Sequence, residues 1–364
     1  MHIGYSSFFQ NPGKQLSDLE VYQNELRLAR LAEPLGFESV WTTEHHFTDY
    51  LISPDVAQYL SYMAGCTEKV LLGAMVFVLP WHDPIRIAEQ IAMLDNMSGG
   101  RMIVGFGRGL GRVEFEGFRL NMGDSREMFA EYADMVMTGL ETGYCEYDGK
   151  FIKQPRRDIR PAPFKSFKDR TYAATMSPDS MPVLAKLGLG ILVIPQKPWT
   201  EVEKDFALYN QVFQEANGTP APPPLSAAFV VVDEDESRAR DLANQYIGNY
   251  YHSVMEHYEL TAGHLANTKG YDFYHRVGKH IEREGRDKAA QDFVDLMPFG
   301  TPEQVIEKVK FINERINNNA LMATFSFGGM PTGDAEKSMR LFAEKVMPEL
   351  KKIKVEKAEF AKTA

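Results

Sequence analysis

KVLLGAMVFVLP, residues 69–80, is a continuous apolar run in the first quarter of the chain. A strand buried on both faces of a parallel sheet has this pattern, whereas a strand with one wet face alternates apolar and polar residues. The stretch that follows, DPIRIAEQIAMLDNMSGG, has helical spacing; it begins with the capping pair Asp83 and Pro84 and ends at Gly99 and Gly100. Together the two stretches predict a strand–helix unit of a parallel α/β fold.

The same unit recurs along the chain in both directions. Strands are expected at residues 2–9, 37–43, 69–80, 101–107, 170–177, 190–195, 224–233 and 320–328. Helices are expected at residues 16–36, 53–66, 83–100, 125–143, 178–188, 200–218, 234–251, 301–316 and 334–353, with Ser53 as the cap of the second. Eight strands alternating with helices predict a single (β/α)8 TIM barrel. The alternative is an open doubly wound sheet, and the 364-residue length favours the barrel.

Two insertions interrupt the repeat. A hairpin is expected at residues 144–154, around Asp148 and Gly149. A long segment from about Glu259 to Phe299, before the last helix–strand unit, has no recognisable barrel element and is expected to be an irregular lid. No linker composition divides the chain, so we expect one domain at residues 1–353 and a tail at residues 354–364.

Composition excludes several classes of function. Hydrophobic residues make up 44% of the chain and the net charge is −10, which allows a large core and disfavours nucleic acid as a partner. Two cysteines, Cys66 and Cys145, indicate neither a disulfide framework nor a zinc site. The N-terminus lacks the features of a signal peptide and no segment approaches the ~20 apolar residues that span a membrane, so we expect a cytoplasmic protein.

Two adjacent histidines stand where barrel chemistry is expected. In a TIM barrel the active site lies at the carboxyl ends of the strands, and Glu44, His45 and His46 directly follow the strand at 37–43. Imidazole groups titrate near pH ~6.5, so His45 is a candidate general base and Glu44 could orient one of the two rings. The histidines between residues 252 and 280 are interpreted as solvated, and no carboxylate is spaced with them for metal binding, so no metal is expected.

The stretch GFGRG, residues 105–109, predicts an anion site. Its glycines leave the backbone around Arg108 open to a ligand, although the spacing does not fit a dinucleotide fingerprint. Arg126 lies near a helix start, and Ser177 and Ser180 lie at another, where free N–H groups favour phosphate. Two arginines and one helix start match a phosphate monoester, so a flat ligand with one phosphate, such as flavin mononucleotide (FMN), would fit the barrel mouth.

Several longer stretches resemble the bacterial luciferase-like flavin monooxygenases, and within that family the luciferase α-subunit pattern most. The resemblance runs from near residue 1 to about residue 352 in matching order and length. The matching stretches are GFESVWTTEHHF, VLPWHDPIRIAEQIAMLDNMSGGR, VGFGRGL, SREMFAEYADMV, EYDGKFI, LYNQVFQEA, TKGYDF, GTPEQVI and SMRLFAEKVMPELKK.

This resemblance implies a two-component monooxygenase. Reduced FMN would be supplied by a separate NAD(P)H:flavin reductase, and O2 would add to the flavin to give a peroxide that attacks an organic substrate. His45 resembles the family's catalytic histidine, and Met75-Val76 lies where the family has a non-proline cis peptide under the flavin. The implied cofactor-binding set is Met75, Val76, Gly107, Arg108, Gly109, Leu110, Arg126, Met176, Ser177 and Ser180. The segment around TKGYDF resembles the family's mobile lid.

The chain departs from the luciferase pattern around the expected pocket. Gly107, Gly111, Met176 and Pro195 stand where that pattern has a cysteine, an aromatic residue, a glutamate and a tryptophan. These changes reshape the substrate pocket and the surroundings of the flavin.

The expected substrate is small and apolar, such as an aldehyde, a ketone or a terpene-like molecule. The substrate-pocket candidates are apolar residues near the ends of strands or in the loops that follow: Phe8, Phe77, Leu110, Phe118, Ile194 and Phe327. The helices expected at 53–66 and 83–100 are apolar around much of their circumference, which predicts a homodimer, with a heterodimer as the alternative.

Two other functions remain open at this stage. One is hydride transfer on the same barrel with the deazaflavin F420, whose longer acidic tail calls for more basic residues at the mouth than Arg108 and Arg126. The other is a non-catalytic flavin-binding protein; such proteins have lost part of the barrel, whereas all eight strands are expected here.

Overall fold

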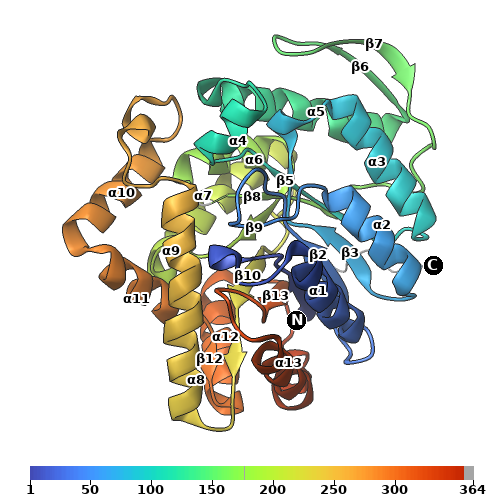
Figure 1. Cartoon of the computed structure of the whole chain (residues 1–364). Helices are drawn as coiled ribbons and strands as arrows, with labels where there is room; N and C mark the ends of the chain where they lie inside the picture. Colours follow the sequence, from blue (N-terminus) through green and yellow to red (C-terminus); the bar gives the residue numbers. More distant parts are fainter. Residues whose placement is uncertain (176, 356–364) are drawn as a thin grey trace.

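The computed structural model describes residues 1–175 and 177–355 and confirms the predicted barrel. Met176, a predicted cofactor residue, and nearly all of the predicted tail lie outside the described residues. Eight parallel strands within the described part close into a ring, with the helices outside it (Figure 1). In ring order they are β1 (His2–Ser7), β2 (Ser39–Thr42), β3 (Leu71–Ala74), β5 (Met102–Gly107), β8 (Thr171–Ala174), β9 (Gly190–Val193), β10 (Leu225–Phe229) and β13 (Ala320–Thr324).

The composition of residues 69–80 predicted one continuous strand, and this prediction was wrong. β3 ends at Ala74, and a second short strand, β4 (Phe77–Val78), pairs with the end of β5. The Met75–Val76 peptide between them is cis, as the family resemblance implied. This break places Met75 and Val76 at the carboxyl end of the barrel.

The outer helices begin close to the predicted positions. α1 (Asp18–Ala32) starts at a capping box in which Ser17 and Glu20 each hydrogen-bond the other's backbone. α3 (Pro84–Met97) is capped by Asp83, as predicted. α2 (Val56–Cys66) is capped by Asp55 rather than Ser53, so the second predicted helix starts later than expected. The remaining large helices are α5 (Ser125–Thr142), α7 (Trp199–Asn217), α8 (Glu236–Leu242), α9 (Gly248–His257), α12 (Pro302–Ile316) and α13 (Thr332–Leu341).

The insertion before the last barrel unit is not irregular. It contains α10 (Asp272–Glu284) and α11 (Arg286–Leu296) at the edge of the barrel, where α11 packs against α9 and α10 packs against α11 (Figure 1). The predicted hairpin is confirmed as β6 (Tyr144–Asp148) and β7 (Lys153–Asp158). None of the helices in the described ranges is both long enough and apolar enough to cross a bilayer.

Candidate functional site

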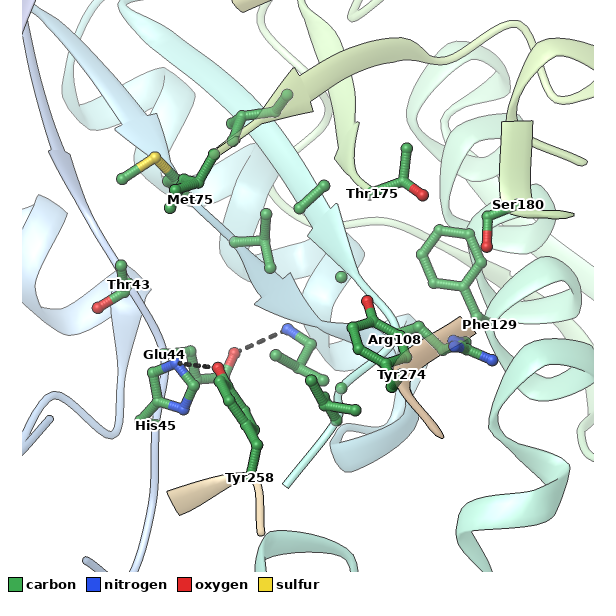
Figure 2. A pocket seen from close by; sticks show the side chains of 18 of the residues that line it. Thr43, Glu44, His45, Met75, Arg108, Phe129, Thr175, Ser180, Tyr258 and Tyr274 are labelled. Atoms are coloured by element: carbon green, nitrogen blue, oxygen red, sulfur yellow. Dashed lines mark hydrogen bonds between the residues drawn. The ribbon is translucent and has the colours of Figure 1, made fainter. Parts of the chain in front are cut away.

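One pocket lies at the carboxyl ends of the strands, where side chains from the strands, the outer helices and the lid converge (Figure 2). Most of the predicted site residues line it, namely Phe8, Glu44, His45, Met75, Val76, Gly107, Arg108, Gly109, Leu110, Arg126, Ser180 and Ile194. Sequence reasoning missed several aromatic and polar lining residues, namely Tyr50, Trp81, Phe129, Thr175, Tyr250, Tyr258 and Tyr274.

Three of the predicted substrate-pocket phenylalanines do not line this pocket. Phe77 is buried in the core, because alternation along β4 turns it away from the side on which its two neighbours face the pocket. Phe118 stacks on Trp81 at 5.8 Å and therefore lies behind a lining residue. Phe327 packs edge-on against Phe229 at 5.0 Å.

His45 is held in a defined orientation at the pocket wall. Its Nδ1 lies 2.9 Å from Oε1 of Glu114, and its Nε2 lies 3.4 Å from the hydroxyl of Tyr258. An ionised carboxylate only accepts hydrogen bonds, so the neutral ring carries its proton on Nδ1. This tautomer leaves Nε2 as an acceptor beside Tyr258, another pocket-lining residue.

Glu114 is the main residue that sequence reasoning missed. It lies on α4 (Arg112–Gly117), a short helix directly after the GFGRG stretch, and it is fully buried. Burial would raise the pKa of Glu114, but the charge of His45, its hydrogen bond and the close approach of His257 outweigh it and lower the pKa to about 2. Glu114 therefore acts as a carboxylate at working pH, and it also accepts the backbone N–H of His46.

The interpretation of His257 as a solvated residue was wrong. It is buried, and its Nε2 lies 3.4 Å from Oε2 of Glu114. The premise that no carboxylate lies near these histidines was wrong as well, because donor atoms of His45, Glu114 and His257 all lie within 4.8 Å of one another. His257 lies far from Glu114 in the sequence, so no local pattern indicated their contact.

Glu44 orients the ring of His46, not that of His45. Its Oε1 accepts from Nε2 of both His46 and His82, at 3.0 and 2.6 Å, and its Oε2 accepts the N–H of Val78. Burial would raise the pKa of Glu44, but these hydrogen bonds and the charge of His82 lower it. The carboxylate therefore ties the loop after β2 to β4, which forms part of the pocket wall.

The other end of the pocket holds two arginines directed at one backbone carbonyl. Nη1 of Arg108 and Nη2 of Arg126 donate to the carbonyl of Gly270, at 3.0 and 3.1 Å. Nε of Arg126 is buried and has no hydrogen-bond partner among the described residues. The hydroxyl of Ser177, which does not line the pocket, is likewise buried and has no partner among the described residues. Ser180 does line the pocket, on the same side as Arg108 in Figure 2.

The packing of β5 also explains why glycines precede Arg108, in addition to the space they leave for a ligand. A Cβ on Gly105 would lie 2.2 Å from the carbonyl oxygen of Ala74, and one on Gly107 would lie 2.3 Å from a methyl of Val76. β5 therefore needs glycine in order to pack against β3 and the cis peptide. Gly109 does have a left-handed backbone, with φ of 84°.

Comparison with known proteins assigns this chain to a family. The family model of luciferase-like monooxygenases matches residues 1–316. The chain belongs to this family. It is therefore an oxidoreductase of the luciferase-like class, as the sequence resemblance indicated.

Two similar proteins match nearly the whole chain. The alkanal monooxygenase alpha chain of Photorhabdus luminescens is 28% identical over 346 residues, 93% of this chain and 94% of that one. The crystal structure of monooxygenase RslO1 from Streptomyces bottropensis is 26% identical, covers 96% of this chain and 100% of that one, and has a TM-score of 0.80.

More distant structures share the fold. The oxygenating constituent of 3,6-diketocamphane monooxygenase from Pseudomonas putida, solved in complex with FMN, has a TM-score of 0.72 at 18% identity, covering 98% and 99% of the two chains. An F420-dependent secondary alcohol dehydrogenase has a TM-score of 0.69 at 17% identity, covering 96% and 98%.

Proposed function

We propose that this protein is a monooxygenase that uses reduced FMN and O2 to oxygenate a small apolar organic molecule. The observation that carries the proposal is that the pocket at the carboxyl ends of the strands has two chemically different ends. Cationic donors gather at one end, around Arg108 and Arg126, and an oriented imidazole, His45, lies at the other. A ligand with one phosphate and a flat ring system matches this division. The alkanal monooxygenase relatives and the FMN complex of the camphane enzyme support the same choice.

The donor groups fit a phosphate monoester. Nε of Arg126 and the hydroxyl of Ser177 are buried without partners among the described residues, which is costly unless a ligand or water satisfies them. Arginine is suited to phosphate because its planar fork can give two hydrogen bonds to one group. Arg108, Arg126, Ser177 and Ser180 are therefore the residues that would hold the phosphate.

The lid favours FMN over the longer F420. Gly270 lies directly against both arginines, and the next residue, Tyr271, is fully buried with its hydroxyl bonded to Ser125 and to the carbonyl of Gly109. The guanidinium of Arg108 also lies 4.1 Å from the centre of the Tyr271 ring. This anchored segment covers the phosphate end, where an acidic tail would have to leave the pocket.

The chain supplies orientation and a proton acceptor. Reduced flavin, when bound, supplies the activation of O2. Met75 and Val76 line the pocket and would contact the ring system, and Glu114 holds His45 with Nε2 free to accept a proton in the pocket. Glu44 acts through its contacts with His46 and Val78, as a positioning residue. Phe8, Leu110 and Ile194, together with the tyrosines of the lid side, make a largely apolar surface for the substrate.

A direct test is oxygenation with 18O2. Purified protein, photoreduced FMN and a panel of aldehydes, ketones and terpenes are mixed, and the products are analysed by mass spectrometry. We expect one 18O atom per product molecule, at a rate above that of free flavin. No labelled product with any compound would contradict the proposal. Reduction or oxidation of the panel with F420 in place of FMN would favour hydride transfer instead.

Arg108→Ala should weaken binding of reduced FMN. The loss of a charge-assisted hydrogen bond corresponds to about 1.5–3 kcal/mol, so the Kd should rise roughly 10- to 100-fold, measured by anaerobic titration calorimetry. Arg108→Lys keeps the charge and should lose less. Arg240→Ala, on an exposed helix away from the pocket, is the control. An unchanged Kd in Arg108→Ala would show that the phosphate binds elsewhere.

Two partners complete the proposal. A separate NAD(P)H:flavin reductase would supply the reduced cofactor, as the family resemblance implies. A second copy of the chain would cover the outer side of α2 and α3, where Tyr62, Met93 and Met97 are exposed. Sedimentation equilibrium of the parent and of Met93→Lys would test the homodimer.

A further inference from the structure

The carboxylate that holds His45 is shared with a second buried imidazole. Oε1 of Glu114 accepts from Nδ1 of His45 and from the N–H of His46, at 2.9 Å each. Oε2 of Glu114 and Nε2 of His257 are both buried and lie 3.4 Å apart, and neither atom has a well-aligned hydrogen-bond partner among the described residues. Each of these two atoms is thus the nearest polar group available to the other.

Gly111 leaves room for this approach. A Cβ at this position would lie 2.4 Å from Oε2 of Glu114 and 3.0 Å from Nε2 of His257. Any side chain there would therefore separate the two groups. The backbone of Gly111 has φ of −70°, which other residues adopt freely, so the absence of a side chain relates to this space and not to backbone conformation.

The surroundings of His257 fix which ring nitrogen carries the proton. Its Nδ1 lies 2.9 Å from the hydroxyl of Thr48, whose oxygen also accepts the N–H of Tyr50. This hydroxyl can either donate to Nδ1 or accept from it. An unprotonated Nε2, however, would face the Glu114 carboxylate with two acceptors buried against each other, so the proton is assigned to Nε2 and the hydroxyl donates to Nδ1. The ring stacks on Tyr50 with its centre 4.5 Å away and an interplanar angle of 16°, which prevents it from turning.

His257 is a neutral donor at working pH. Burial lowers its pKa, with a smaller contribution from the charge of His45, against the opposing effects of Glu114 and Glu259. The other titratable groups packed around it are Tyr50 and Tyr258, whose pKa values are raised by burial. Glu114 is therefore the only anion in contact with His257 among the described groups, and Glu259 is already paired with Arg112.

We propose that His257 is a positioning residue that acts on His45 through Glu114. Its Nε2–H occupies the second oxygen of the carboxylate, which keeps Glu114 ionised and fixed and keeps His45 in the tautomer with Nε2 free toward the pocket. Without this donor, Glu114 would interact more strongly with a protonated His45 and hold it as a cation, which cannot accept a proton. The consequence for catalysis rests on the proposed function; the tautomers of the two rings do not.

The tautomers can be read without any assay of activity. In protein labelled with 15N-histidine, ring-nitrogen chemical shifts at neutral pH should show His45 protonated on Nδ1 and His257 protonated on Nε2. Assignment uses the His45→Gln and His257→Gln variants. A His45 ring protonated on Nε2, or a cationic His257, would overturn the proposal whatever reaction the protein catalyses. The tautomers themselves are measured on the parent protein, and the variants serve only to assign the signals.

The kinetic test compares His257→Leu, which removes the donor, with His257→Gln, which retains an N–H group. In the leucine variant we expect kcat/KM to fall ~10-fold or more and the acidic limb of its pH profile to move to higher pH by about one unit. The glutamine variant should recover most of both. His252→Gln on the same helix, where His252 faces Asp287, is the control. A uniform loss of rate with an unmoved limb would show a purely structural role and overturn the proposal.

A metal ion is the competing explanation for two imidazoles and a carboxylate in one place. Titration of the parent and of His257→Leu with Zn2+ decides this. We expect no stoichiometric binding that depends on His257. Tight binding of one Zn2+ to the parent that is lost in the leucine variant would overturn the role of His257 as a hydrogen-bond donor.

Discussion

Replacing His45 with alanine is expected to lower the kcat/KM of oxygenation by about 10²- to 10⁴-fold, the range typical of a lost general acid or base. The imidazole lines the pocket and presents Nε2 as an acceptor beside Tyr258, while its other nitrogen is held by a buried carboxylate. Alanine removes the proton acceptor and leaves Glu114 with one of its partners missing. The rate is measured with reduced FMN and the substrate found in the 18O2 screen, at saturating and limiting substrate.

In His45→Ala the rate of oxygenation should fall much more than the affinity for reduced FMN. The phosphate donors around Arg108 lie at the other end of the pocket, so the Kd for reduced FMN should change less than ~10-fold. His46→Ala is the informative contrast, because His46 contacts Glu44, Trp81 and Phe118 and does not line the pocket. It should lose far less activity than His45→Ala. Equal losses in the two variants, or a His45→Ala enzyme within threefold of the parent, would show that His45 has no role in proton transfer.

The barrel could be predicted because its signal is local and repeated. Each parallel strand is buried on both faces, so each appears as a short apolar run. Some helices also carry start signals of their own, such as Ser17 with Glu20 or Asp83 with Pro84. His45 was expected at the barrel mouth because it comes just after the end of one such run. These inferences need only a few neighbouring residues, and the structure confirms them.

What sequence reasoning missed depends on the tertiary fold. Glu114 meets His257 only because α4 and the end of α9 meet at the barrel rim, and no spacing along the chain indicates this. The error at Phe77 has a different cause: a continuous apolar strand gives no sign of which face points to the pocket. The helix α10, in contrast, had a visible signal, since Phe273, Val277 and Ile281 recur at helical spacing within a polar segment.

The opposite end of the barrel gives the largest expected effect on stability, from Asp95→Asn. Asp95 lies near the end of α3, and its two oxygens accept from Nη1 and Nη2 of Arg170 at 2.7 and 2.8 Å, with both side chains at most 3% exposed. Arg170 directly precedes β8 and also donates to the carbonyl of Met102 at the start of β5. The pair therefore joins an outer helix to two neighbouring strands at their amino ends, the side of a TIM barrel associated with stability.

Asparagine keeps the shape of Asp95 but leaves the guanidinium of Arg170 buried without a counter-charge. Breaking a buried ion pair in this way costs about 3–5 kcal/mol, so the free energy of unfolding should fall by that amount in urea titrations followed by circular dichroism. Asp148→Asn, at the exposed hairpin turn, makes the same chemical change to an ion pair in solvent and should leave the unfolding midpoint unchanged. Since Asp95 does not line the pocket, the folded fraction of Asp95→Asn should bind reduced FMN with the parent Kd. A variant as stable as the parent would mean that water or a shifted neighbour compensates Arg170, and the pair would then not be what fixes α3 to the barrel.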